Sequence, residues 1–112
     1  MAEYVEVLRG LSHAAFGQRY RLECMLAIAD SSDGLVTLSG LAGQLGVAPS
    51  NLQHPIRSLV LTGLLTPLAS GDSRSRFYLR SDSAAWSWVL ELREQALGAA
   101  SSSDLEHDKR DK

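Results

Sequence analysis

The sequence holds little of what several classes of protein require. Its 112 residues include a single cysteine, Cys24, so no disulfide can form within the chain and no Cys-x-x-Cys pair suggests a zinc site. No run of about 18 apolar residues is present that could cross a membrane. Residues 1–16 carry Glu3, Glu6 and Arg9 where a secretion signal needs an uninterrupted apolar stretch. We therefore expect a cytoplasmic protein with no membrane partner.

Groups that carry out catalysis are also scarce. The three histidines, His13, His54 and His107, lie in unrelated segments, so a metal or proton-transfer site has nothing to assemble around. No Gly-rich phosphate loop, nucleophile elbow or paired-carboxylate motif is present. Cys24 lies in the apolar, helical segment RLECMLAIA, which favours a buried structural thiol over a redox sensor. We expect no enzymatic activity, no cofactor and no metal.

The chain lacks a positive net charge, but its charges are unevenly distributed. The net charge of -2 argues against a general binder of polyanions. Residues 49–80, however, hold Arg57, Arg74, Arg76 and Arg80 against the single acidic residue Asp72. A nucleic-acid face requires such a local excess, because cations that contact phosphate supply much of the affinity. The same arginines would also suit an ordinary solvated surface.

What is present is an apolar content of 45%, enough for one domain with a core, and a mainly helical pattern. The pattern predicts helices over residues 3–16, 18–29, 40–46, 50–62 and 84–100, a short strand over residues 35–38, and a hairpin over residues 64–80 with a polar loop at residues 70–75. Residues 1–100 therefore form one domain, and residues 101–112 read as a disordered polar tail.

Several single residues predict where these elements begin or end and which strand lies at the edge of the sheet. Ser39 is the candidate cap of the third helix, which Gly46 ends. Asp82 or Ser83 caps the last helix. Pro67 cannot donate a ladder hydrogen bond, so its strand fits best at the edge of a sheet.

The segment around Gly46 has the spacing of a helix-turn-helix. The glycine makes the turn, a small residue lets the two helices approach, and apolar positions fix their crossing. The small and apolar residues in question are Leu41, Ala42, Leu45, Leu52 and Ile56. Many helical hairpins share parts of this pattern, but here the predicted β-hairpin follows directly after LTGLL.

Three segments, LSHAAFGQRYRLECMLAIA, LSGLAGQLGVAPSNLQHPIRSLVLTGLL and PLASGDSRSRFYLR, together resemble the winged helix-turn-helix regulators over about residues 10–82. The resemblance is closest to the ArsR type, with the MarR type a near relative. It implies a mainly α fold with a small β-hairpin, in the order α-α-β-α-α-β-β-α. It also implies a homodimer on double-stranded DNA, with the second helix of the motif in the major groove and the hairpin, or wing, on the flanking backbone or minor groove.

Carried over onto this sequence, the resemblance gives seven DNA-binding candidates. They are Ser50, Asn51, Gln53, His54 and Arg57 in the second helix of the motif and Arg74 and Arg76 in the wing. Asn and Gln can pair bidentately with adenine, and Arg with guanine or with phosphate. The alternative is that they form the solvated side of an amphipathic helix and an ordinary polar loop.

The last helix is richer in large apolar residues than one core-facing stripe needs, which favours a dimer interface shared with the first helix. The candidates are Tyr4, Leu8, Leu11, Trp86, Trp88, Val89 and Leu92. A symmetric dimer predicts a pseudo-palindromic operator with half-sites about 34 Å apart. These residues could instead thicken a thin core, or dock another protein, which would make the chain a protein-interaction module. The Cys-x-Cys and His/Asp sensor motifs of many ArsR-type proteins are missing, so no effector is predicted.

Pro55 lies inside the predicted DNA-recognition helix, where proline removes a hydrogen-bond donor and disfavours helical angles at His54. If Ser50 caps this helix, Pro55 forgoes only the bond to the Asn51 carbonyl. We predict a single helix whose first turn is loosened or 3₁₀-like.

Overall fold

The computed structural model describes the backbone of residues 2–69 and 76–110 and the side chains of residues 3–69 and 76–100. Within these residues the order of elements is the predicted one. The elements are α1 (Ala2–Phe16), α2 (Arg21–Asp30), β1 (Leu35–Thr37), α3 (Leu38–Leu45), α4 (Ser50–Leu61), β2 (Leu65–Pro67), β3 (Phe77–Arg80) and α5 (Ala84–Arg110).

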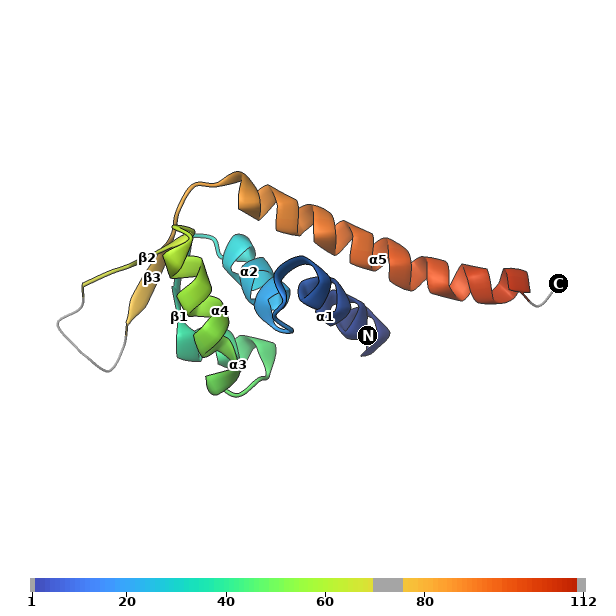
Figure 1. Cartoon of the computed structure of the whole chain (residues 1–112), viewed down its shortest axis with the longest axis horizontal. Coiled ribbons are helices and arrows are strands. Elements are labelled where there is room, and N and C mark those ends of the chain that lie inside the picture. Colours follow the sequence, from blue (N-terminus) through green and yellow to red (C-terminus); the bar gives the residue numbers. More distant parts are fainter. Residues whose placement is uncertain (1, 70–75, 111–112) are drawn as a thin grey trace.

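The helix α2 lies at the centre of the fold. Apolar residues occupy most of its circumference, as expected of a helix that neighbours cover on several sides. It packs against α1, α5, α3 and α4, and Figure 1 shows α5 running beside α1 and α2 and continuing beyond them. Leu22, Met25 and Ile28 of α2 are buried together with Leu52 of α4 and Val89 of α5. This core holds α4 and the sheet at one end of the molecule.

The three strands form one antiparallel sheet in the order β1-β3-β2. The predicted hairpin is therefore present, and β1 extends it by pairing with β3. Tyr78 of β3 is opposite both Val36 of β1 and Pro67 of β2. Pro67 lies in an edge strand, as its missing N–H predicts. We call β2, β3 and the segment between them the wing.

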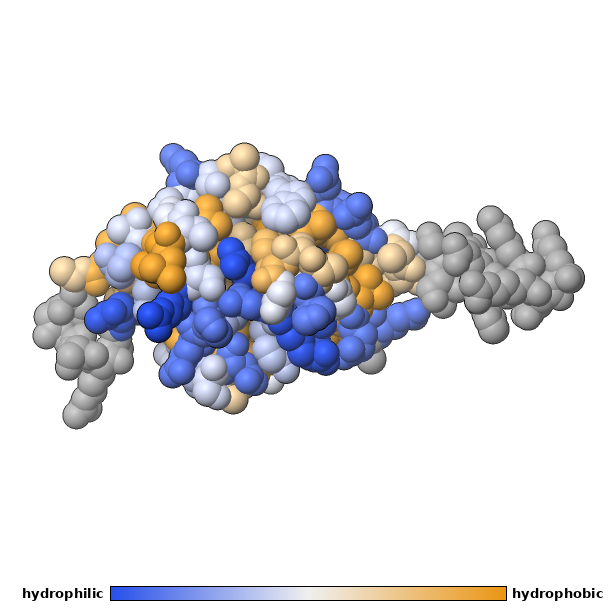
Figure 2. Space-filling view, in the orientation of Figure 1, coloured by the Kyte–Doolittle hydropathy of each residue, from blue (hydrophilic) through white to orange (hydrophobic). Residues whose placement is uncertain are grey.

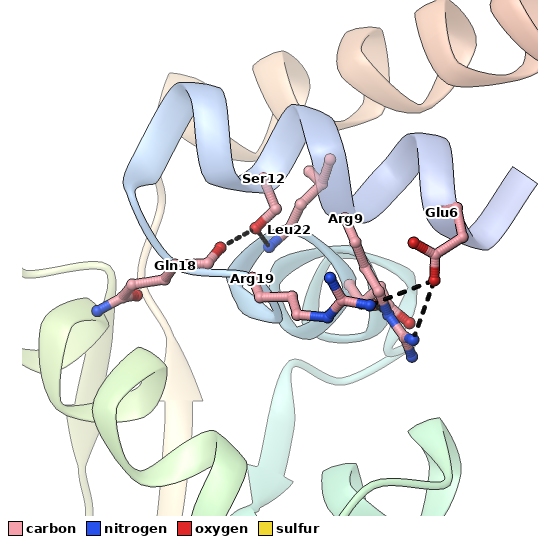
Figure 3. Close-up of polar contacts among 7 residues, drawn as sticks. Glu6, Arg9, Ser12, Gln18, Arg19 and Leu22 are labelled. Carbon is pink, nitrogen blue, oxygen red and sulfur yellow. Dashed lines mark hydrogen bonds and ion pairs between the residues drawn. The ribbon is translucent and has the colours of Figure 1, made fainter.

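The start of α2 is set by a side chain of α1. The helix begins at Arg21 rather than at Gln18, where the sequence pattern placed it. The hydroxyl of Ser12, which is fully buried, donates to the carbonyl of Gln18 and accepts from the backbone N–H of Leu22 at 2.9 Å (Figure 3). The first bond holds residue 18 outside the helix, and the second satisfies an N–H that the first turn of α2 leaves free.

Replacing Ser12 with alanine is expected to lower the free energy of unfolding by about 2 kcal/mol, because it leaves a buried N–H and a partly buried carbonyl without the hydroxyl that they share. Urea unfolding measures this change. The matched control is Ser87→Ala on the exposed side of α5, which is expected to change the free energy by less than about 0.5 kcal/mol. Equal effects of the two substitutions would contradict the role given to Ser12.

The structure identifies the N-terminal caps of α3 and α5. The cap of α3 differs from the predicted residue, and that of α5 is one of the two predicted candidates. Thr37, not Ser39, caps α3, because β1 ends in an extended conformation at Thr37 and brings its Oγ1 to 3.0 Å from the N–H of Gly40. Ser83 rather than Asp82 caps α5, since its hydroxyl accepts from the N–H of Ala85 at 3.0 Å. Gly46 ends α3 in the left-handed conformation with φ 69°, as predicted.

The helix α4 is continuous through Pro55, as the predicted single helix requires. Ser50 is the first helical residue and not the cap, because the chain enters from Pro49 without a side-chain cap. The opening bonds of α4, from Asn51 N–H to the carbonyl of Ala48 and from Leu52 N–H to that of Pro49, are of 3₁₀ type, as predicted for the first turn. Pro55 itself is buried, so its ring packs in the core while its missing donor costs one helical bond.

Part of the predicted dimer interface lies inside the chain's own core. Leu8, Trp86, Val89 and Leu92 are buried among α1, α2 and α5, which corrects their assignment to an exposed dimer surface. Trp86 also donates its indole N–H to the carbonyl of Ser81 at 2.7 Å. Helical spacing identified these residues as buried, but it could not distinguish burial in a core from burial against a partner.

The helix α5 continues beyond Ala100, where the sequence pattern ended it, to Arg110. No glycine or proline follows Gly98 to stop the helix. The tail predicted for residues 101–112 lies partly outside the described residues, and its lack of order stays a prediction.

Candidate nucleic-acid interface

The helix α4 buries one side and exposes the other. Leu52, Ile56 and Leu59 recur at helical spacing and are buried, together with Pro55. The five side chains predicted to contact DNA are all exposed: Ser50, Asn51, Gln53, His54 and Arg57. The polar side of α4 is therefore free of the chain's own core.

These side chains occupy different flanks of α4. Gln53 and Arg57, four residues apart, lie on the flank toward the wing. Ser50 and His54, also four apart, lie opposite the buried stripe. Asn51 shares its flank with Ser58, whose hydroxyl accepts from the side-chain amide of Gln18 at 3.1 Å. That contact joins α4 to the turn between α1 and α2.

A groove of about 300 Å³ separates α4 from the wing. Its lining residues are Leu38, Gln53, Ile56, Arg57, Val60, Pro67, Arg76 and Tyr78. We call it the α4–wing groove. Of the seven residues predicted to bind DNA, it brings together Gln53, Arg57 and Arg76. Arg74 lies outside the described residues, and its DNA contact stays a prediction.

Tyr78 was not among the candidates from the sequence. Alternate residues of a strand share a face, so Tyr78 and Arg80 of β3 lie on the side of the sheet that faces the core. Arg76 directly precedes the strand in the same alternation and lies nearest the wing loop. The alternation in RFYLR is the signal that could have identified Tyr78 as a neighbour of Arg76.

Arg80 belongs to the fold and not to the interface. Its Nη1 donates to the backbone carbonyls of Ile28 at 2.8 Å, Ala29 at 3.1 Å and Ser31 at 2.9 Å, at the C-terminal end of α2. Carbonyls in the last turn of a helix have few helical partners, although that of Ile28 also accepts from the N–H of Ser31, and the helix dipole attracts a cation there. Of the four arginines in residues 49–80, Arg80 is therefore not available to a nucleic acid, and the local excess of positive charge is smaller than the sequence indicates.

The remaining cations divide into paired and unpaired ones. Arg9 pairs with Glu23 at 2.7 Å, Arg19 with Glu6 at 3.2 Å, and Arg93 with Asp30 at 2.7 Å. The hydrogen bond to Glu23 raises the pKa of Arg9, and that to Asp30 raises the pKa of Arg93. In the part of the chain that the structure describes, no ion pair involves Arg57 or Arg76.

Unneutralised positive charge therefore gathers beside α4 and the wing. Figure 2 shows strongly hydrophilic residues on this face between the wing and α4. Exposed cations without acidic neighbours can attract phosphate over the range of a Debye length, about 10 Å in 0.1 M salt. The arrangement is suited to binding a polyanion.

Cys24 is fully buried in α2, and burial raises the pKa of its thiol from 9.0 to about 12. The thiolate is the reactive form, so at pH 9 about one thiol in a thousand is ionised in the folded protein, against half in the unfolded chain. We expect iodoacetamide at pH 9 to alkylate the native protein at least about a hundredfold more slowly than the urea-unfolded protein. Equal rates, followed by mass spectrometry, would restore the redox-sensor alternative.

Across residues 2–69 and 76–110, no helix is long and apolar enough to span a membrane. In the same ranges, no three His, Cys, Asp or Glu residues are grouped so that they could hold a metal ion.

No protein-family model matches the sequence, and no curated protein matches it, but solved structures resemble the fold. The chain superposes on Sco3205 of Streptomyces coelicolor, a MarR family transcriptional regulator in complex with DNA, with 18% identity, a TM-score of 0.63 and coverage of 96% of this chain and 75% of that one. The chain also superposes on a MarR family regulator from Silicibacter pomeroyi, with 22% identity, a TM-score of 0.65 and coverage of 92% of this chain and 67% of that one. For the transcriptional regulator BldR from Sulfolobus solfataricus, the identity is 14%, the TM-score 0.63 and the coverage 91% of this chain and 71% of that one.

At these identities the likeness concerns the fold, which is a winged helix-turn-helix, as the sequence predicted. The type named in two of these structures is MarR, the near alternative from the sequence. Nothing in them supports the ArsR type specifically.

Proposed function

We propose that the chain is a sequence-specific DNA-binding transcriptional repressor of the MarR type, which acts in the cytoplasm as a homodimer and without catalytic activity. The helix α4 enters the major groove, and the wing contacts the flanking backbone or minor groove. The observation that carries the proposal is the convergence of Gln53 and Arg57 of α4 with Arg76 of the wing at one groove, where no acidic residue among residues 3–69 and 76–100 pairs with either arginine. The similar structure in complex with DNA supports it further.

The proposed dimer uses the side chains of α1 and α5 that the core leaves exposed. Trp88 is 43% exposed, although its ring packs edge to face on that of Phe16, with 5.4 Å between the ring centroids. Leu90 and Leu97, seven residues apart, lie on the other flank of α5, and Leu97 is 45% exposed. Tyr4 and Leu11 of α1 are partly exposed and belong to the same proposal. Hydrophobic residues along α1 and α5 are visible in Figure 2.

The dimer is tested by gel filtration with light scattering. The wild-type protein is expected to have the mass of two chains of 12.1 kDa each, and Leu97→Glu the mass of one. Because Leu97 lies outside the core, its substitution is expected to leave the fold intact. A wild-type mass of a single chain at micromolar concentration would contradict the dimer.

DNA recognition is tested by selecting bound fragments from a random-sequence duplex pool. The proposal predicts an enriched inverted repeat whose half-sites lie one helical turn, about 34 Å, apart. Recovery of no preferred sequence would contradict sequence-specific binding.

The second candidate function is a protein-interaction module that docks a partner through α5. The exposure of Trp88 and Leu97 on that helix favours it. The selection from the duplex pool separates the two functions, because an interaction module is expected to retain no duplex even at low salt. For such a module, Leu97→Glu is expected to abolish binding of the protein partner.

A further inference from the structure

The α4–wing groove has a polar rim over an apolar floor. Arg57 and Gln53 of α4 form one side of the rim, and Arg76 with Tyr78 of β3 the other. Leu38, Ile56, Val60 and Pro67 line the rest of the groove. Its walls come from two rigid elements, α4 and β3, which the core fixes relative to each other.

The rim has the chemistry of a phosphate site. Guanidinium groups present planar forks of N–H donors that match phosphate oxygens, and a tyrosine hydroxyl adds a neutral donor. Among the described residues, no Asp or Glu lines the groove to compete for these donors. The apolar floor keeps water away from one side of the site, which strengthens the attraction between opposite charges.

We propose that the α4–wing groove seats one backbone phosphate of DNA, held by Arg57 and Arg76 with the hydroxyl of Tyr78 as a further donor. This inference rests on the proposed function and deepens it. A phosphate bound there fixes the depth and rotation of α4 on the duplex, because backbone contacts set register. Base reading then falls to Ser50 and His54, which project from α4 opposite its buried stripe, and to Gln53 at the rim.

The proposal is tested with Tyr78→Phe, which removes the hydroxyl and keeps the ring. Binding of a mixed-sequence duplex of about 20 base pairs is followed by fluorescence anisotropy at several salt concentrations. We expect affinity to fall about tenfold at every salt concentration, which is about threefold for each of the two hydrogen bonds that a dimer loses. The dependence on salt should not change, because no charge is removed.

The control is Tyr20→Phe, at a tyrosine whose ring lies between Arg9 and Arg19, in a different part of the fold from α4 and the wing. It is expected to leave duplex affinity unchanged. Thermal melting of both variants shows whether each is folded. An affinity of Tyr78→Phe equal to that of the wild type would overturn the phosphate seat, while the wild type's own binding would still support DNA recognition.

A second measurement needs no variant. Inorganic phosphate is titrated into the wild-type protein, and the side-chain Nε–H resonances of the arginines are followed by NMR. We expect the resonances of Arg57 and Arg76 to shift together with one dissociation constant, and those of Arg93 to stay fixed. Equal shifts of all arginines would overturn the site, and absence of duplex binding by the wild type would instead reject the proposed function.

Discussion

Arg80→Met is expected to lower the free energy of unfolding by about 3 kcal/mol, the largest loss of stability that we predict for one side chain. One guanidinium nitrogen of Arg80 donates to three backbone carbonyls at the end of α2. Methionine retains much of the apolar stem but offers no donor, so these partly buried acceptors lose their common partner. The substitution also removes the side-chain hydrogen bonds that join β3 to the central helix.

Thermal or urea unfolding measures the effect, and a change of this size corresponds to a fall in Tm of roughly 10 °C or more. The matched control is Arg93→Met, because the side chain that Arg93 bonds among the described residues is the exposed carboxylate of Asp30. Exposed ion pairs contribute about 0–1 kcal/mol, so this control should unfold close to the wild type. Similar losses in the two variants would contradict the structural role of Arg80.

The second large effect concerns DNA. The double variant Arg57→Gln, Arg76→Gln is expected to bind a selected duplex about 60-fold more weakly in 0.1 M salt. Each protomer loses the contact to one phosphate, so a dimer loses two, and the slope of log affinity against log salt becomes shallower by about 1.8. Electrophoretic shifts or anisotropy at several salt concentrations give both quantities.

A control with the same change in charge separates local contact from general attraction. Arg19→Gln with Arg93→Gln also removes two positive charges, but at arginines outside the α4–wing groove, each of which pairs with an acid. Screening over about 10 Å in 0.1 M salt should leave this control with nearly wild-type affinity and slope. If the two double variants lost affinity equally, the groove would have no special role.

The recognition helix could be predicted from the sequence because its information is local. The spacing of Leu52, Ile56 and Leu59 identifies the buried side, and Gln53 and Arg57 then fall on the exposed one. The turn at Gly46 and the hairpin after it place the wing beside that helix. These are patterns within a few residues, which periodicity and turn chemistry determine.

Contacts between distant segments could not be predicted in this way. Arg80 counted as a surface cation until the fold brought it to carbonyls about 50 residues earlier in the chain. Ser12 sets the start of α2 from a neighbouring helix, and no local signal marks it. The apolar residues of α5 raised a different difficulty, because a helical stripe does not reveal whether Val89 faces a core or a partner.

The central claim is that α4 and the wing bind double-stranded DNA, and the salt dependence of wild-type binding tests it most directly. The measurement is fluorescence anisotropy of a labelled duplex from the selection, titrated with wild-type protein between about 50 and 200 mM salt. We predict tight binding at the lowest salt and a linear fall of log affinity with log salt, as expected when arginines displace counterions from phosphate. Absence of binding at low salt, or an affinity that does not change with salt, would contradict the claim.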